Sequence, residues 1–319
     1  MRSNLSVGLE MAKGLSLAWQ VPLIGIHHMQ AHLLTPRLVS SLACGEQRSF
    51  TPEFPFLSVL VSGGHSMLVK SASLTDHQLL ASSVDIAMGD SLDKAARAIL
   101  PSDILQNANT TMYGKVLEQF AFPNGRADYA DYVPPMTRGE ELVKRKSPWG
   151  WSITAPFANT RILELGFASI ASTVERIVSQ QQKRDSTIIP IDERVHLARE
   201  SMRVCFEHLA SRTIIALEAL RSQKTRINTL VIGGGVAANQ FLITVLRSFL
   251  QVRGFEHVDI VAPPPSLCTD NAAMIGWAGI EMFEAGWRTD LGVLPLRKWT
   301  LDPREEDGGI LGPDGWIKV

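Results

Sequence analysis

NTLVIGGGVAANQFL, residues 228–242, decides the fold class, because it joins an apolar, strand-like run to a glycine turn and the start of a helix. Apolar residues at helical spacing predict that this helix covers residues 239–252. HVDIVAP (257–263) then predicts another strand, and residues 270–285 predict another long helix. This β-α-β-α order is typical of an α/β protein.

Strands and helices also alternate earlier in the chain. PLIGI (22–26) predicts a short strand, residues 28–38 predict a helix, and residues 54–70 predict two strands around the turn SGGH. Residues 122–157 are rich in proline, glycine and aromatic residues and predict a loop-rich insert. The other expected helices cover residues 1–20, 89–100, 110–121, 160–183 and 193–222.

Length, charge and cysteine content limit the class of protein. A chain of 319 residues is longer than one compact core usually holds, which favours two lobes with a cleft between them. No apolar run reaches the roughly 18 residues needed to cross a bilayer, so we expect no membrane span. The net charge of −1 means that any nucleic-acid-binding surface must be local. Cys44, Cys205 and Cys268 are far apart and fit buried thiols in a reducing compartment.

HHMQAH, residues 27–32, contains a candidate metal site. His28 and His32 lie one helical turn apart, so their ring nitrogens can converge on one metal ion, although packing or surface roles would give the same spacing. The zinc-protease signature is incomplete, because no glutamate lies between the two histidines. Asp270, at the expected start of the last long helix, is the best candidate for a third ligand and equally a candidate N-cap.

Two glycine-rich turns are candidate ligand loops. In VSGGHSML (61–68), Ser62, Gly63 and Gly64 could present backbone N–H groups to an oxyanion, or could form a plain hairpin turn. In the second turn, Gly233, Gly235 and Ala238 satisfy the GxGxxA pattern of dinucleotide-binding proteins, with Asp259 about where a ribose acceptor belongs. Gly233, Gly234 and Gly235 could equally serve an adenosine or acyl-nucleotide site.

Two polar residues have alternative interpretations. Asn239 is either the N-cap of the following helix or a hydrogen-bond partner of ligand hydroxyls. Asp93, within GDSLDKAARAI (89–99), either contacts a ligand or pairs with Arg97 one turn later.

Together these motifs resemble one family, the tRNA threonylcarbamoyladenosine synthases of the actin and sugar-kinase-like superfamily. The resemblance rests on the order HHMQAH, VSGGH, GDSLDKAAR, GGGVAAN and CTDNAAMIGWAG, which spans most of the chain, and the mitochondrial branch is the most similar. It implies a two-lobed α/β fold with part of the first lobe missing, because family members begin with strands that carry a phosphate motif. Residues 1–50 would then be the remnant of the first lobe, residues 51–290 the second lobe, and residues 291–319 a tail returning to the first. Such a chain would expose a sheet edge and apolar helix faces.

The resemblance also implies the reaction, which is transfer of a threonylcarbamoyl group from its adenylate to the exocyclic amine of the adenosine next to the anticodon. It implies one divalent ion, Zn or Fe, held by His28, His32 and Asp270. No covalent protein nucleophile is expected. The implied substrate-binding residues are Leu60, Val61, Ser62, Gly63, Gly64, Asp93 and Asn239.

The implied partners are tRNA, a separate synthase that supplies the adenylate, and a second copy of the chain in a homodimer. The implied compartment is the mitochondrion, with the cytoplasm as the alternative. Lys144, Arg145 and Lys146, beside two tryptophans in VKRKSPWGW (143–151), are candidates for tRNA contact through phosphates and stacking. The competing interpretation of this stretch is a solvated loop with tryptophans that face the core.

The sequence departs from the family in two places. Residues 101–112 lack the glycines of a Pro-Gly-Gly loop, and residues 151–160 read WSITAPFANT in place of a Ser-Gly-Leu-Lys stretch. A non-catalytic scaffold that binds tRNA or a partner is therefore an alternative to the transferase. A nicotinamide-dependent oxidoreductase is the third hypothesis, and it gives the two histidines and Asp270 no role.

Overall fold

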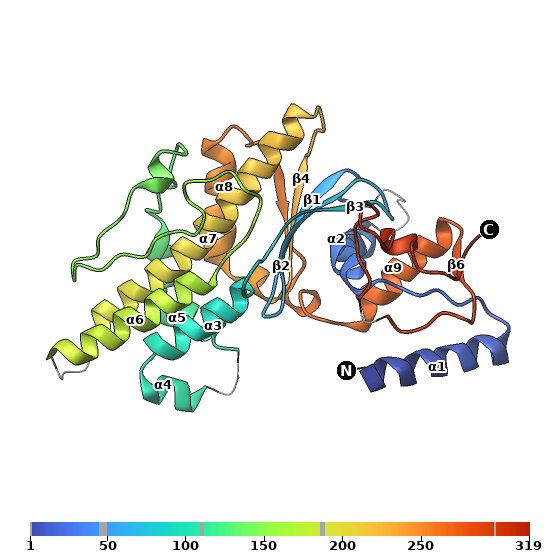
Figure 1. Ribbon diagram of the computed structural model, residues 1–319, viewed down its shortest axis with the longest axis horizontal. Helices are drawn as coiled ribbons and strands as arrows, with labels where there is room; N and C mark the ends of the chain where they lie inside the picture. The colour runs from blue at the N-terminus through green and yellow to red at the C-terminus, as the bar shows by residue number, and fades with distance from the viewer. Residues whose placement is uncertain (1, 45–49, 109–111, 186–188, 297) are drawn as a thin grey trace.

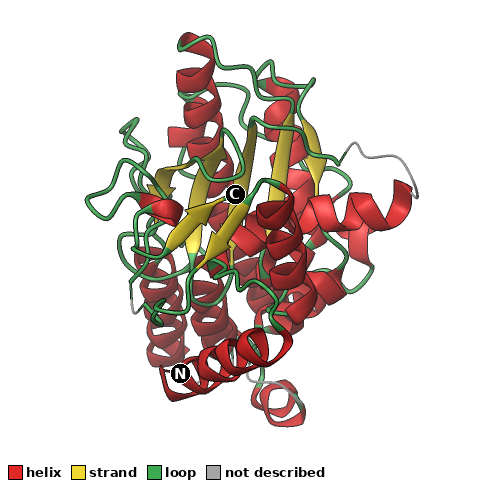
Figure 2. Ribbon diagram, turned by 90° about the vertical axis from the view of Figure 1, so that its right-hand side faces the viewer, coloured by secondary structure: helices red, strands yellow, loops and turns green. Residues whose placement is uncertain are grey.

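The computed structural model describes residues 2–44, 50–108, 112–185, 189–296 and 298–319. A five-stranded sheet with the strand order β3-β2-β1-β4-β5 forms its centre (Figure 2). Strand β2 pairs antiparallel with both β1 and β3, whereas β1, β4 and β5 run parallel to one another. The strands span Phe56–Val61 (β1), Ser66–Ser71 (β2), His77–Ser82 (β3), Thr229–Gly233 (β4) and Asp259–Val261 (β5).

Packing on both faces of β1 explains why its sequence, FLSVLV, is almost wholly apolar and fully buried. Leu57, Val59 and Val61 contribute to the larger core, which the helices on the left of Figure 1 complete. Leu60 belongs to a separate core on the opposite side, together with Leu33 of α2. The helices of the larger core and its surroundings span Met88–Ile99 (α3), Ser102–Asn107 (α4), Gly114–Ala121 (α5), Ala168–Asp185 (α6), Ile191–Ser222 (α7) and Gln240–Val252 (α8).

Helices α2 and α9 pack against each other on the other side of the sheet, to the right in Figure 1. A buried ion pair between Arg37 of α2 and Glu281 of α9 joins them, with Nη2 and Oε2 2.9 Å apart. Strands β6 and β7 form a small antiparallel pair beside α9. These elements span His28–Cys44 (α2), Ala272–Glu284 (α9), Trp287–Thr289 (β6) and Trp316–Lys318 (β7).

The expected N-terminal helix is confirmed as α1, Arg2–Trp19. None of residues 4–20 is buried, so the apolar side chains of this helix face solvent. Its large exposed apolar side chains are Leu5, Val7, Met11, Leu15, Leu17 and Trp19. Within the described part of the chain, no helix is both long and apolar enough to span a membrane. Cys205 and Cys268 are free, buried thiols, as expected.

Some predicted elements are wrong or incomplete. Residues 22–26 form no strand, and only Leu23 makes a single bridge, to Thr289. The helix expected over residues 110–121 begins at Gly114, while positions 110 and 111 lie outside the described residues. Neither α4 nor β3 was predicted. Within residues 122–157 the structure has loops and short 3-10 turns. In the described part of the chain, the 3-10 turns are Gly125–Tyr129 (η1), Glu140–Leu142 (η2), Gly235–Ala238 (η3), Pro265–Leu267 (η4) and Gly309–Leu311 (η5).

The helix expected over residues 160–183 begins only at Ala168. The buried guanidinium of Arg212 donates hydrogen bonds to the carbonyls of Thr160 and Ile162 at 3.0 and 2.7 Å. These carbonyls accept from a distant side chain where a helix would supply backbone N–H groups, and Leu165 instead forms a parallel bridge with Ser83.

Candidate metal centre and ligand loops

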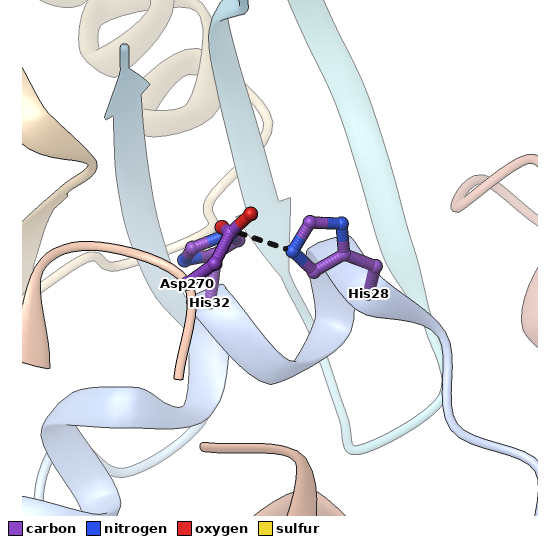
Figure 3. Close-up of side chains that lie close together, drawn as sticks. All are labelled: His28, His32 and Asp270. Carbon is purple, nitrogen blue, oxygen red and sulfur yellow. Dashed lines mark hydrogen bonds and ion pairs between the residues drawn. The ribbon is translucent and has the colours of Figure 1, made fainter. Parts of the chain in front are cut away.

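His28 and His32 of α2 come together with Asp270, which lies far along the sequence just before α9 (Figure 3). His28 is the first residue of α2 and His32 follows one turn later, so both rings lie on one face of the helix. Asp270 lies just before α9. The N-cap of α9 is Asn271, whose side chain accepts a hydrogen bond from the Met274 N–H at 3.0 Å. The interpretation of Asp270 as the N-cap is therefore wrong, and its carboxylate faces the imidazoles instead.

The spacing of these donor atoms fits a divalent metal ion. The Nε2 atoms of His28 and His32 lie 3.2 and 3.0 Å from the same Oδ1 of Asp270, and one ligand atom from each residue lies within 4.8 Å of the others. With bonds of about 2.0–2.1 Å, tetrahedral zinc ligands lie about 3.4 Å apart, which is close to these distances. The side chains of His28 and Asp270 are 52% and 76% exposed, so further coordination positions would be open to a substrate. Imidazole and carboxylate donors suit Zn or Fe.

Electrostatics keep His32 and Asp270 in the protonation states that a metal ion requires. Burial is the main cause of the lowered pKa of His32, and the neighbouring His28 lowers it further, so the ring remains a neutral ligand. Burial acts to raise the pKa of Asp270, but the charges and hydrogen bonds of the two histidines outweigh it and lower that pKa. An ionised carboxylate and a neutral imidazole are the metal-binding forms.

Ser62 closes the turn between β1 and β2. Its Oγ accepts hydrogen bonds from the N–H groups of Gly64 and His65 at 3.2 and 3.0 Å. Gly63 and Gly64 are exposed, and a Cβ at either position would meet no atom within 4 Å. The segment is a turn between two antiparallel strands, and it presents its two glycines to open space. His65, which ends the turn, contributes an electrostatic effect that lowers the pKa of His32.

Two glycines from other segments enclose the end of β1. The N–H of Gly89 donates to the carbonyl of Ser62 at 3.1 Å, and a Cβ on Gly89 would lie 2.7 Å from that oxygen. Gly234 has a φ of +91°, and a Cβ at this position would lie only 2.3 Å from the Val61 carbonyl oxygen, which is too close. Leu60 and Val61 themselves are buried strand residues. Sequence reasoning missed Gly89, because its role depends on a distant backbone, and only its position at the start of a motif helix hinted at it.

The dinucleotide interpretation of the second glycine turn is not supported by the sheet. Asp259 pairs with Thr229, at the opposite end of β4 from Gly233. Four strand residues separate these two levels, about 13 Å at 3.3 Å per residue, so Asp259 is not at the glycine end of the sheet. A Cβ on Gly235 would meet nothing within 4 Å, so this glycine, unlike Gly234, borders open space.

Asp93 lies in α3 and Asn239 directly precedes α8, and both of these helices contribute to the larger core. Asp93 Oδ1 accepts a hydrogen bond from the Gly114 N–H at 2.8 Å, and burial raises the pKa of Asp93. Arg97 lies over the ring of Tyr113 at 5.3 Å, and its charge acts to lower the pKa of Asp93, although burial outweighs it. Asn239 is the N-cap of α8 and accepts hydrogen bonds from two N–H groups of its first turn at 3.0 and 3.1 Å. The contact between Gly114 and Asp93 was not predicted, because Gly114 lies just beyond residues 101–112, which correspond to the Pro-Gly-Gly loop of the family.

The basic stretch of the insert combines exposed charges with partly packed tryptophans. Lys144, Arg145 and Lys146 are exposed. The rings of Trp149 and Trp151 are nearly parallel, with 7° between their planes and 6.4 Å between their centroids. Trp151 Nε1 donates to a carboxylate of α7 at 2.9 Å. One indole is therefore anchored on the protein, while the cations face solvent.

Fold and cluster together describe an α/β protein with a candidate three-ligand metal centre. Residues 3–277 match the family model for tRNA N6-adenosine threonylcarbamoyltransferase. The chain is 35% identical to the mitochondrial tRNA N6-adenosine threonylcarbamoyltransferase of Schizosaccharomyces pombe, over 99% of this chain and 67% of that protein. It is 30% identical to the tRNA N6-adenosine threonylcarbamoyltransferase of Zymomonas mobilis, over 95% of this chain and 69% of that protein.

The chain belongs to the tRNA N6-adenosine threonylcarbamoyltransferase family. The resemblance inferred from the order of its motifs is confirmed. The oxidoreductase and scaffold alternatives are not favoured by these relatives.

Proposed function

We propose that this chain transfers a threonylcarbamoyl group from threonylcarbamoyl-adenylate to the exocyclic amine of the adenosine next to the anticodon in tRNA. The observation that carries the proposal is the convergence of His28, His32 and Asp270 in a chain of this family. A divalent ion held by the three side chains would supply positive charge to polarise the group being transferred.

The chemistry needs positioning more than a reactive side chain. A bond forms between the adenine amine nitrogen and the carbamoyl carbon, the bond from that carbon to the phosphate oxygen breaks, and the amine loses a proton as AMP leaves. An adenine amine is a poor nucleophile, so holding it against the carbonyl is the main contribution required of the protein. Gly63 and Gly64 border open space where backbone N–H groups could stabilise developing negative charge. Asp93 and Asn239 are proposed to contact the substrate from the helical side.

The finer assignments belong to the same proposal. The ion is one Zn or Fe per subunit, because two imidazoles and one carboxylate suit either. Lys144, Arg145 and Lys146 are proposed to contact tRNA, since they are exposed and lie close in sequence to two nearly parallel indoles. We propose Gly235 as part of an adenylate loop because it borders open space. The mitochondrial name of the Schizosaccharomyces pombe relative supports a mitochondrial location. A separate adenylate synthase and a homodimer complete the proposal.

The test is nucleoside mass spectrometry of unmodified tRNA incubated with the purified chain, threonylcarbamoyl-adenylate and Zn²⁺. We expect the wild type to form threonylcarbamoyladenosine, and to form none with tRNA that carries guanosine in place of the adenosine next to the anticodon. The transfer rate of His32→Ala should be at least a hundredfold lower. The matched control is His257→Ala, which removes an exposed histidine remote from the cluster. Binding of tRNA without turnover would support the scaffold, and full activity of His32→Ala would refute the role of the cluster.

A further inference from the structure

His27, which precedes the metal cluster, caps the helix that carries the two histidines. Its Nδ1 accepts hydrogen bonds from the N–H groups of Met29 and Gln30 at 3.1 and 3.4 Å. These are the second and third residues of α2, which are the N–H groups that an N-cap side chain normally satisfies. An imidazole therefore performs here what serine, threonine, aspartate or asparagine does at most helix starts.

The other ring nitrogen of His27 reaches the C-terminal part of the chain. Nε2 lies 2.7 Å from the carbonyl oxygen of Trp299. A carbonyl oxygen only accepts, so Nε2 carries the proton and Nδ1 is left as the acceptor that the cap requires. One neutral tautomer thus satisfies both contacts. The side chain is buried, with 5% of the residue exposed, so water does not compete for either nitrogen.

Trp299 is itself held in place. Its Nε1 donates to the carbonyl of Gly309 at 3.1 Å. The rings of His27 and Trp299 meet edge to face, with centroids 4.8 Å apart. Trp316 of β7 lies against Trp299 with centroids 6.4 Å apart and donates from its own Nε1 to the carbonyl of Ile310 at 2.9 Å. The Trp299 carbonyl, which accepts the hydrogen bond from His27, therefore belongs to a segment that is anchored to the rest of the protein.

We propose that His27 is a positioning residue that couples this C-terminal segment to the metal centre. His28 is the first residue of α2 and its side chain is half exposed, so the direction of its ring depends on the backbone of the first turn. His27 fixes that turn because its Nδ1 caps the helix while its Nε2 donates to the Trp299 carbonyl. The inference rests on the proposed metal centre, because it concerns the affinity and geometry of that centre.

The test measures metal binding by competition with a chromogenic chelator for Zn²⁺, and coordination geometry by the visible absorption of bound Co²⁺. We expect His27→Ala to weaken Zn²⁺ binding by roughly tenfold or more and to shift the Co²⁺ spectrum, as loss of groups that orient metal ligands does. His27→Asn keeps a capping oxygen but loses the Trp299 contact, so we expect an intermediate loss of a few-fold. The control is Val174→Ala, which destabilises the larger core, remote from His27. Its Zn²⁺ affinity and Co²⁺ spectrum should match those of the wild type.

Each failure has its own signature. Wild-type affinity and spectrum in His27→Ala would overturn the inference and leave the metal centre intact. Wild-type behaviour of His27→Asn with weakened binding in His27→Ala would reduce the role of His27 to capping and overturn the coupling to Trp299. No Zn²⁺ binding by the wild type would overturn the proposed metal centre, and the inference with it.

Discussion

Replacement of Arg37 by methionine should destabilise the protein strongly and weaken its metal centre. Arg37 and Glu281 are 12% and 7% exposed, and the Arg37 Nε lies 2.9 and 3.0 Å from the two carboxylate oxygens. Arg37 Nη1 also donates to the carbonyls of Phe50 and Pro52 at 3.1 and 2.7 Å. Arg37→Met leaves the Glu281 carboxylate buried without its cation, and such a loss costs about 3–5 kcal/mol.

The double variant Arg37→Met with Glu281→Leu separates the lost attraction from the unpaired charge. Because no buried charge remains, we expect it to be more stable than the single variant. It should not regain wild-type stability in full, since the Phe50 and Pro52 carbonyls lose a donor and the Trp277 Nε1, 2.6 Å from Glu281 Oε1, loses its acceptor. Such unsatisfied buried groups cost about 1–3 kcal/mol.

Urea unfolding followed by tryptophan fluorescence measures these free energies, and chelator competition measures Zn²⁺ affinity in the same samples. Arg37 and Glu281 join the two helices that bring His28 and His32 to Asp270, so Zn²⁺ affinity should fall with the single variant. A loss of less than about 1 kcal/mol in Arg37→Met, as for an exposed ion pair, would refute the reasoning.

Three further predictions concern the turn, a buried histidine and the metal. Gly89→Ala puts a Cβ 2.7 Å from the Ser62 carbonyl oxygen, so we expect a loss of about 1–3 kcal/mol in urea unfolding and reduced transfer activity. Gly276→Ala, where a Cβ meets nothing, should instead stabilise α9 by up to about 1 kcal/mol, and equal effects of the two would contradict the steric explanation. Burial lowers the pKa of His77 from 6.5 to about 4, so the unfolded chain takes up a proton that the folded chain refuses as the pH falls between these values. The free energy of unfolding should therefore fall by up to about 3 kcal/mol across that window, and His77→Gln should lose this contribution to the slope; an identical pH profile would contradict it. Zn²⁺ should raise the melting temperature of the wild type but not of His32→Ala, because it binds only the folded site, and a rise in both would point to Zn²⁺ bound elsewhere.

The fold elements that sequence predicts well are those whose burial follows from local periodicity. The apolar run of β1 and the long apolar face of α7 are examples, and the structure places both within two residues of their expected bounds. Residues 160–167 failed because Arg212, 52 positions from Thr160, removes helical hydrogen-bond acceptors. Periodicity within a window contains no information about such a distant donor.

The same distinction applies to the site. His28 and His32 could be placed on one face from helical spacing alone. The approach of Asp270 depends on the packing of α2 against α9, and the sequence pointed to Asp270 as the candidate N-cap of the second helix, whereas Asn271 has that role. The capping role of His27 was hidden for a different reason, because histidine is rarely an N-cap and its partner carbonyl lies 272 residues away.

The most direct measurement is the single-turnover rate of threonylcarbamoyl transfer to tRNA by metal-stripped protein, before and after stoichiometric Zn²⁺ or Fe²⁺ is restored. Rapid transfer that returns with one equivalent of metal in the wild type, and does not return in His28→Ala or His32→Ala, is the result expected from a catalytic metal centre at these residues. Transfer by stripped protein at the full rate, or full recovery in both histidine variants, would contradict it.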